Sequence, residues 1–297
     1  MIALITGASG LLGRAVHKCF NDSGKFDAVV GISYSRTKGD LRKVDLCDKE
    51  ALSSLLDEVK PQVIIHCAAE RRPDVAEKDT AGTLKLNVEV SENLASEALK
   101  HDSRLIYIST DYVFDGTSPP YHVNDQPNPL NFYGKSKLQG EIAVHQTNPG
   151  AIVLRVPVLY GEVEFPGESA VNILIENVND TSKNYNMDHH SSRYPTHVKD
   201  VALVCLELAE CSAKKIPPIL HYSAPERLTK YDMCCIFSNI TGKNIDHIKP
   251  DSVAPPFNPS GTTRPEDCEL SIDALTSLGV GTFPPTSLKE WFEKYLK

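Results

Sequence analysis

Short apolar runs alternate with amphipathic segments through the first half of the chain. Residues 2–6 form an uninterrupted apolar run before a glycine, which is typical of a strand buried in a parallel sheet. Asp48 can cap a helix that ends near Val59, because Pro61 stops it. Further helices are expected at 11–23, 80–100 and 129–146, and further strands at 27–33, 43–46, 62–67, 104–109 and 151–156. This alternation predicts an α/β fold with a Rossmann-type, doubly wound parallel sheet.

The pattern loosens after residue 156. Helices are expected at 169–178, 198–211, 230–240 and 287–296, short strands at 219–223 and 245–249, and a proline-rich stretch at 250–265. We therefore expect two parts. Residues 1–156 plus 195–215 form the sheet domain. Residues 157–194 plus 216–297 form a smaller, discontinuous C-terminal lobe that closes over the carboxyl edge of the sheet.

The composition argues against several classes of protein. The 297 residues carry a formal net charge of −8, which does not suit a general nucleic-acid binder. No apolar run reaches membrane-spanning length, and the first residues read as a core strand and not as a signal peptide. The 8 cysteines form no C-x-x-C pair, so we expect reduced cysteines in a cytoplasmic protein. The histidines between 189 and 197 lack a ligand spacing, so no metal is expected.

Three glycines between the first strand and the first helix indicate a dinucleotide site. In this motif Gly7 permits the tight turn, Gly10 lets backbone amides approach a diphosphate, and Gly13 lets the helix pack against the strand. The helix N-terminus then faces the anion. A glycine pattern alone can reflect only a tight turn, but this one lies between a strand and a helix, as the motif requires.

The end of the second strand favours NADP over NAD. Sites for NAD usually place Asp or Glu there, whereas this chain has Arg36 and no acid. Arg36 can bind a phosphate bidentately, and Arg14 could add charge; the alternative is that Arg36 is a solvated loop arginine. The residues that we assign to NADP are Gly7, Ser9, Gly10, Leu11, Leu12, Gly13, Arg14, Arg36, Asp45, Leu46, Cys67, Ala68, Ala69, Asn87, Tyr133, Lys137 and Arg155.

A tyrosine and a lysine four residues apart suggest carbonyl chemistry. Tyr133 and Lys137 share one face of a helix, and the lysine ammonium is expected to lower the pKa of the phenol. The phenol would then donate a proton to a carbonyl that receives hydride, while the lysine binds the nicotinamide ribose. Thr110, with Ser109 as the alternative, would bind the carbonyl oxygen. The Y-x-x-x-K pattern is common by chance, but its place after a glycine loop makes it more specific.

These motifs resemble the extended short-chain dehydrogenase/reductases over nearly the whole chain. The stretches 109–116 (STDYVFDG) and 129–135 (PLNFYGK) look like the dTDP-4-dehydrorhamnose reductase branch. That resemblance implies reduction of a nucleotide-sugar ketone with NADPH. Thr110, Tyr133 and Lys137 are the catalytic residues if the chain turns over a substrate.

Other stretches resemble the regulatory β subunits of methionine adenosyltransferase II. They are 10–18, 67–74, 159–164, 187–189 and 193–200. This resemblance implies an NADP-binding subunit without recognised turnover, which binds the catalytic subunit of S-adenosylmethionine synthesis and tunes its methionine response. It also implies a place in one-carbon metabolism. Those β subunits carry an N-terminal extension and a C-terminal docking tail that this sequence does not contain, so another surface or a longer form of the chain would have to supply docking.

Three arginines would lie near the mouth of the expected pocket. Arg71, Arg72 and Arg193 could form an anion subsite for a sugar-nucleotide diphosphate or for the acidic surface of a partner. The alternative is ordinary ion pairs with neighbouring carboxylates. Whether the chain regulates a partner, reduces a substrate, or senses the NADPH/NADP⁺ ratio stays open at this point.

Overall fold

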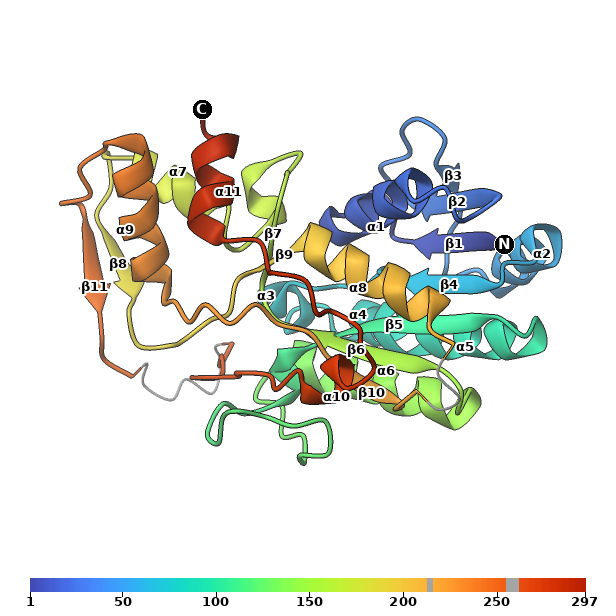
Figure 1. The fold of residues 1–297 in the computed structure, drawn as a ribbon. Helices are drawn as coiled ribbons and strands as arrows, with labels where there is room; N and C mark the ends of the chain where they lie inside the picture. Colours follow the sequence, from blue (N-terminus) through green and yellow to red (C-terminus); the bar gives the residue numbers. More distant parts are fainter. Residues whose placement is uncertain (213–215, 255–261) are drawn as a thin grey trace.

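A seven-stranded parallel sheet forms the centre of the computed structural model, which describes residues 1–212, 216–254 and 262–297 (Figure 1). The strands are β1 (Ile2–Thr6), β2 (Ala28–Ser33), β3 (Arg42–Lys43), β4 (Val63–His66), β5 (Arg104–Thr110), β6 (Ile152–Val156) and β10 (Ile219–His221). Their order is β10-β6-β5-β4-β1-β2-β3, so the winding reverses between β1 and β4. This order confirms the predicted Rossmann-type fold and places a crevice where β1 and β4 end.

Helices cover both faces of the sheet, which is why its strands are apolar without alternation. On one face, α1 (Leu11–Asp22) and α8 (Val198–Glu210) pack in the same cluster as Ile5. On the other, α2 (Lys49–Val59), α5 (Val90–Lys100) and α6 (Phe132–Thr147) pack with Leu4. The predicted cap of α2 is present, since the Asp48 carboxylate accepts hydrogen bonds from the amides of Glu50 and Ala51.

The helix expected at 80–100 is interrupted. It consists of α4 (Thr80–Leu84), a π turn η1 (Lys85–Glu89) and α5. Asn87 lies in the π turn and is fully buried. Such single π turns insert one extra residue into a helix and redirect its side chains, often beside functional sites.

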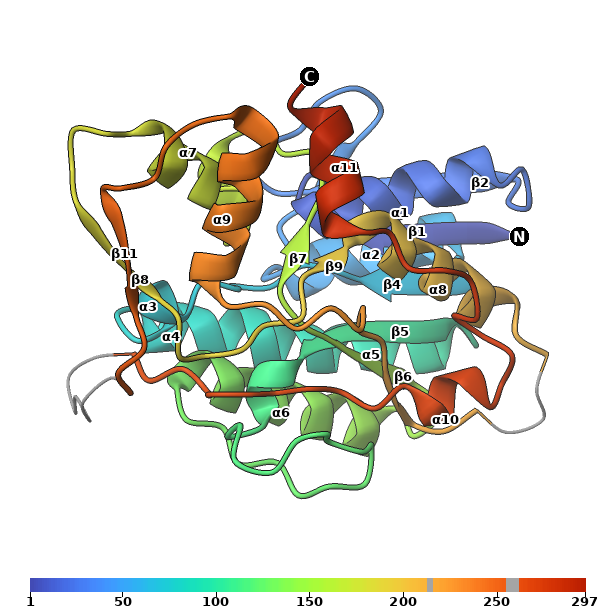
Figure 2. The same cartoon turned by 60° about the vertical axis from the view of Figure 1, so that its left-hand side comes forward.

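A smaller lobe lies beside the carboxyl edge of the sheet (Figures 1 and 2). It contains α7 (Leu174–Asn179), β8 (Tyr185–Asp188), α9 (Lys230–Thr241), β11 (Ile248–Asp251) and α11 (Leu288–Tyr295), where β8 and β11 form a parallel pair. A second pair, β7 (Leu159–Tyr160) with β9 (Thr196–His197), connects the two parts. The lobe has its own apolar cluster around Phe237 and Phe292. The remaining short helices are α3 (Pro73–Ala76), η2 (Asp111–Val113), η3 (Pro166–Glu168) and α10 (Asp273–Thr276).

Three sequence expectations differ from this architecture. The sequence analysis assigns 216–297 to the lobe. In the structure, strand β10 belongs to the main sheet, and Leu275 and Val280 pack in the core cluster of the sheet domain. A three-residue strand at a sheet edge has too little pattern to show which sheet it joins. The helix expected at 169–178 begins only at Leu174, and the strand expected at 43–46 is Arg42–Lys43. None of the helices in the described parts of the chain combines the length and the hydropathy that a membrane crossing requires.

Candidate functional site

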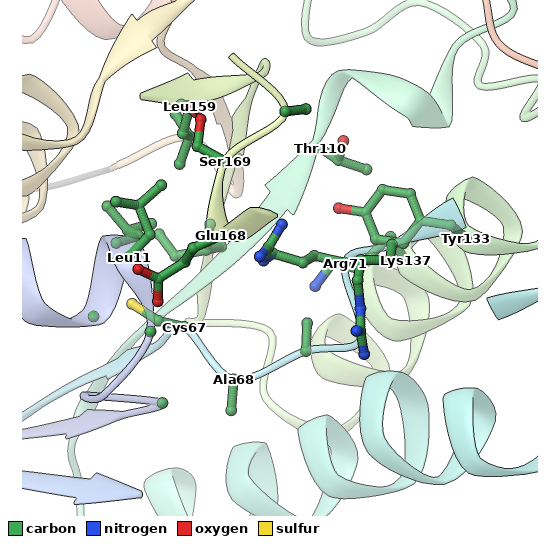
Figure 3. Close-up of a pocket in the computed structure, with 18 of the residues that line it drawn as sticks. Leu11, Cys67, Ala68, Arg71, Thr110, Tyr133, Lys137, Leu159, Glu168 and Ser169 are labelled. Atoms are coloured by element: carbon green, nitrogen blue, oxygen red, sulfur yellow. Dashed lines mark hydrogen bonds between the residues drawn. The ribbon is translucent and has the colours of Figure 1, made fainter. Parts of the chain in front are cut away.

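A cavity of about 890 Å³ lies at the carboxyl ends of β1, β2, β4, β5 and β6 (Figure 3). Its other wall comes from the smaller lobe, through Leu159, Glu168, Arg193 and Lys230 among others. This is the crevice in which doubly wound sheets bind their ligands, and its volume suits a cofactor-sized molecule. The cavity therefore lies between the two parts of the chain.

The glycine loop forms a close-packed cradle at one end of this cavity. Gly7 has φ +63°, and a Cβ there would lie 2.8 Å from the backbone nitrogen of Ala68. A Cβ on Gly13 would lie only 2.1 Å from the carbonyl oxygen of Gly7. Among the described residues, no side chain caps the start of α1 and no acid lies in its first turn, so its first amides can bind an anion. These residues fit the diphosphate of a dinucleotide.

The structure brings most of the predicted site residues to the cavity. Those that line it are Gly7, Ser9, Gly10, Leu11, Leu12, Gly13, Arg36, Asp45, Leu46, Cys67, Ala68, Ala69, Arg71, Arg72, Thr110, Tyr133, Lys137 and Arg193. Three predicted cofactor ligands do not line it: Arg14, Asn87 and Arg155. Each of these three makes buried or partly buried contacts that explain its position.

Asn87 supports the cavity wall from behind. Its amide nitrogen donates to the carbonyl of Glu70 at 3.0 Å and to Ser136 Oγ at 2.9 Å. Its amide oxygen accepts from the backbone nitrogen of Glu70 at 2.8 Å. The side chain thereby ties the loop after β4 to helix α6, which carries Tyr133 and Lys137.

Arg155 belongs to a buried ion pair and not to the cofactor site. Its side chain is 1% exposed and donates from Nε and Nη2 to the two carboxylate oxygens of Glu141, at 2.9 and 2.6 Å. The guanidinium carbon lies 5.1 Å from the centre of the Phe114 ring. The assignment of Arg155 to cofactor binding is therefore wrong, because the register of β6 turns the side chain toward α6.

The two arginines assigned to a phosphate are ion-paired with the smaller lobe. Arg14 binds both carboxylate oxygens of Glu168 at 2.8 and 2.7 Å, and Arg36 binds Glu164 and Glu168 at 2.8 Å each. Sequence reasoning missed Glu168, whose carboxylate is turned toward Leu11 and Cys67 in Figure 3. The arginines and a backbone amide lower the pKa of Glu168 to about 2 despite its burial.

Tyr133 lines the cavity, and its hydroxyl is turned into it in Figure 3. Burial raises its pKa well above the ordinary value, while a hydrogen bond with Thr110 acts in the opposite direction. The expectation that Lys137 lowers this pKa is wrong here, since desolvation dominates. The phenol stays protonated at neutral pH, which is the form that can donate a proton to a carbonyl.

Lys137 is 2% exposed, and its Nζ lies 3.9 Å from the centre of the Tyr107 ring. Desolvation lowers the pKa of Lys137 to about 7, against an opposing effect of the Glu141 charge. Asp111 is a further buried group on the cavity wall that sequence reasoning missed. It accepts a hydrogen bond from Thr110 Oγ at 3.0 Å, and burial raises its pKa to about 6.

The three arginines of the expected anion subsite have different surroundings. Arg72 pairs with Glu70 at 2.7 Å, as the ion-pair alternative describes. Arg71 extends into the cavity in Figure 3, and the ion pairs found within the described ranges do not include it. Arg193 is 6% exposed and donates from Nη1 to the carbonyls of Ser192 and Pro265, at 2.6 and 3.1 Å.

Comparisons with known proteins agree with this geometry. Residues 1–297 match the family model described as the RmlD substrate binding domain. The structure of a dTDP-4-dehydrorhamnose reductase ortholog from Clostridium acetobutylicum superposes with a TM-score of 0.83, at 28% identity over 100% of this chain and 98% of the other. A dTDP-4-dehydrorhamnose reductase from Bacillus anthracis, solved in complex with NADP, gives 0.83 at 24% identity over 99% and 97%. Fold and site thus define an RmlD-type, reductase-like protein.

Relatives with higher sequence identity show which family within this class the chain belongs to. The methionine adenosyltransferase 2 subunit beta of Xenopus tropicalis is 48% identical over 285 residues, which cover 95% of this chain and 84% of that protein. The Mus musculus subunit is 47% identical over 291 residues, with coverages of 97% and 86%. A dTDP-4-dehydrorhamnose reductase of Aggregatibacter actinomycetemcomitans is 34% identical over 213 residues, 70% of this chain and 67% of the other. The chain belongs to the family of methionine adenosyltransferase 2 β subunits.

Proposed function

We propose that this chain is an NADP(H)-binding, non-catalytic regulatory subunit of methionine adenosyltransferase. It binds the catalytic subunit and modulates that subunit's methionine kinetics, in the cytoplasm and within S-adenosylmethionine synthesis and one-carbon metabolism. The observation that carries the proposal is 48% identity over 95% of the chain to a protein named as such a β subunit. A relationship of this extent usually preserves the surfaces on which assembly depends.

The cavity supports the cofactor part of the proposal. The cradle of Gly7, Gly10 and Gly13 would hold the diphosphate, and Lys137 would bind the nicotinamide ribose. Arg36, at the end of β2, would bind the ribose phosphate that distinguishes NADP from NAD. When bound, NADPH can supply hydride and NADP⁺ can accept it. A regulatory subunit does not require this chemistry, because the binding free energy of the cofactor is sufficient for regulation.

The direct test is to mix the chain with the methionine adenosyltransferase catalytic subunit in the presence of NADP. We expect a complex by light scattering at micromolar concentrations and an altered dependence of S-adenosylmethionine formation on methionine. Absence of a complex under these conditions would refute the assignment.

A second candidate is an active NADPH-dependent reductase of a nucleotide-sugar ketone. It is favoured by one observation, the presence of Thr110, Tyr133 and Lys137 on the wall of one cavity. It predicts NADPH oxidation with a dTDP-4-keto-6-deoxyhexose, monitored by absorbance and abolished in Tyr133→Phe. If the wild-type chain oxidises no NADPH with several nucleotide sugars, this candidate is excluded and the regulatory function stands.

A further inference from the structure

A short segment of the smaller lobe holds the arginines at the cofactor end of the cavity. It runs from the end of β7 through η3 and contributes Glu164 and Glu168. We propose that Glu168 is the positioning residue through which the cavity selects a dinucleotide that carries a ribose phosphate. The inference rests on the proposed function, because it concerns how the same site distinguishes NADP from NAD.

Both terminal nitrogens of Arg14 are engaged in hydrogen bonds, and Arg14 does not line the cavity. Its Nη1 donates to the carbonyl of Ser9 at 2.7 Å and to Glu168 at 2.8 Å. Its Nη2 donates to the carbonyl of Glu162 at 3.1 Å and to the second oxygen of Glu168 at 2.7 Å. These bonds account for all four protons of the two terminal nitrogens. Arg14 therefore anchors Glu168 to the glycine loop.

In the described part of the chain, the Arg36 guanidinium donates hydrogen bonds from one nitrogen. Its Nη1 donates to Glu164 and to Glu168 at 2.8 Å each, and its guanidinium carbon lies 5.6 Å from the centre of the Phe165 ring. Within the described residues, Nε and Nη2 of Arg36 make no hydrogen bond. These two nitrogens form one edge of the guanidinium, which is the edge that binds a phosphate bidentately. Arg36 lines the cavity, and within the described residues its bonds to the carboxylates leave this edge without a hydrogen-bond partner.

In this group of charged side chains, the orientation of hydrogen-bond donors must contribute more to phosphate binding than the net charge does. Three basic side chains, Arg14, Arg36 and Lys38, lie among three acidic ones, Glu162, Glu164 and Glu168, so their formal charges cancel. Glu168 is 1% exposed, and its carboxylate accepts from both arginines and from the amide of Glu164 at 3.0 Å. A ribose phosphate would thus find little surplus positive charge. What it would find is a correctly oriented Arg36, which among the described residues is held by hydrogen bonds to Glu168 and Glu164 and by its contact with the Phe165 ring.

The test compares the Kd values of NADP⁺ and NAD⁺ by titration calorimetry for the wild type and for Glu168→Gln. We expect the variant to raise the Kd of NADP⁺ by about tenfold or more and to leave that of NAD⁺ within about twofold. Glu162→Gln is the matched control, since it removes the same charge from an exposed side chain and should change neither Kd by more than about twofold. If Glu168→Gln does not fold, Glu164→Gln should give a smaller change in the same direction.

Three results would overturn the inference. If Glu168→Gln tightens NADP⁺ binding, the carboxylate acts as a competing anion and not as a positioning group. If it weakens both dinucleotides equally, its role is structural only. A wild-type chain that binds NAD⁺ more tightly than NADP⁺ would also overturn it while leaving dinucleotide binding intact, whereas a chain that binds neither would refute the cofactor part of the proposed function as well.

Discussion

Arg155→Met should destabilise the protein without weakening dinucleotide binding. The substitution leaves Glu141, which is 2% exposed, with Ser109 as its remaining hydrogen-bond partner among the described residues. Breaking a buried ion pair from one side costs about 3–5 kcal/mol, because the other charge stays buried without compensation. At about 2–4 °C for each kcal/mol, the melting temperature should fall by on the order of 10 °C.

The control is the double variant Arg155→Met/Glu141→Leu. It removes both charges and replaces them with apolar groups, so most of the lost stability should return. Thermal unfolding followed by circular dichroism gives the stabilities, and fluorescence titration at low temperature gives the Kd of NADP⁺ for each folded variant. The ion-pair and cofactor roles of Arg155 thereby have separate readouts.

Two results would contradict this reasoning. A double variant that is no more stable than Arg155→Met would show that the loss comes from packing against Phe114 and not from the unpaired carboxylate. An Arg155→Met protein with wild-type stability and a tenfold higher Kd would show that Arg155 binds the cofactor, as the sequence suggested.

Three further predictions concern the cavity wall. Gly13→Ala should weaken NADP⁺ binding by at least about tenfold in calorimetry, because its Cβ would lie 2.1 Å from a carbonyl oxygen; Gly150→Ala, with 3.4 Å to its nearest neighbour, should not. The pKa of Lys137 is about 7 in the folded protein and 10.5 in the unfolded chain, so between these pH values the unfolded chain binds more protons. The free energy of unfolding should therefore rise with pH in this range by up to about 1.4 kcal/mol per pH unit. If the urea midpoint of Lys137→Met rises with pH as much as that of the wild type, this prediction is refuted. Asn87→Ala removes three hydrogen bonds of a fully buried side chain and should cost about 2–3 kcal/mol by urea denaturation. A smaller loss than that of Asn21→Ala, at an exposed position, would contradict the role of the π turn.

The parts of the fold that local patterns determine could be predicted from the sequence. The apolar runs of the strands and the Asp48 cap are signals within a few residues, and they gave the doubly wound sheet. The π turn at 85–89 could not be predicted, because the contacts of Asn87 with Glu70 and Ser136 stabilise it. Strand β10 was also assigned to the wrong part. Its place depends on pairing with β6, in which Ile219 lies opposite Val153, 66 residues earlier in the chain.

The same distinction applies to the site. The glycine cradle is local and was predicted, including the close packing at Gly13. The ion pair of Arg36 with Glu168 spans 132 residues and two parts of the chain, so no spacing indicates it. The direction of the Tyr133 pKa shift was wrong because charge proximity can be inferred from an i, i+4 spacing, whereas burial cannot.

The contribution of the smaller lobe to the cofactor end of the cavity bears on regulation. Arg14 and Arg36 belong to the sheet domain, and the carboxylates that hold them belong to the lobe, so the phosphate end of the site is complete only when the two parts are joined. A ligand that binds this joined state and not a separated one must stabilise it, by about 2.7 kcal/mol at a hundred times its Kd. Under the proposed function, NADP would therefore stabilise the joined arrangement without any chemical step at Tyr133. A reductase-like cavity therefore suits the proposed regulatory function, which requires of NADP only that it bind across the two parts.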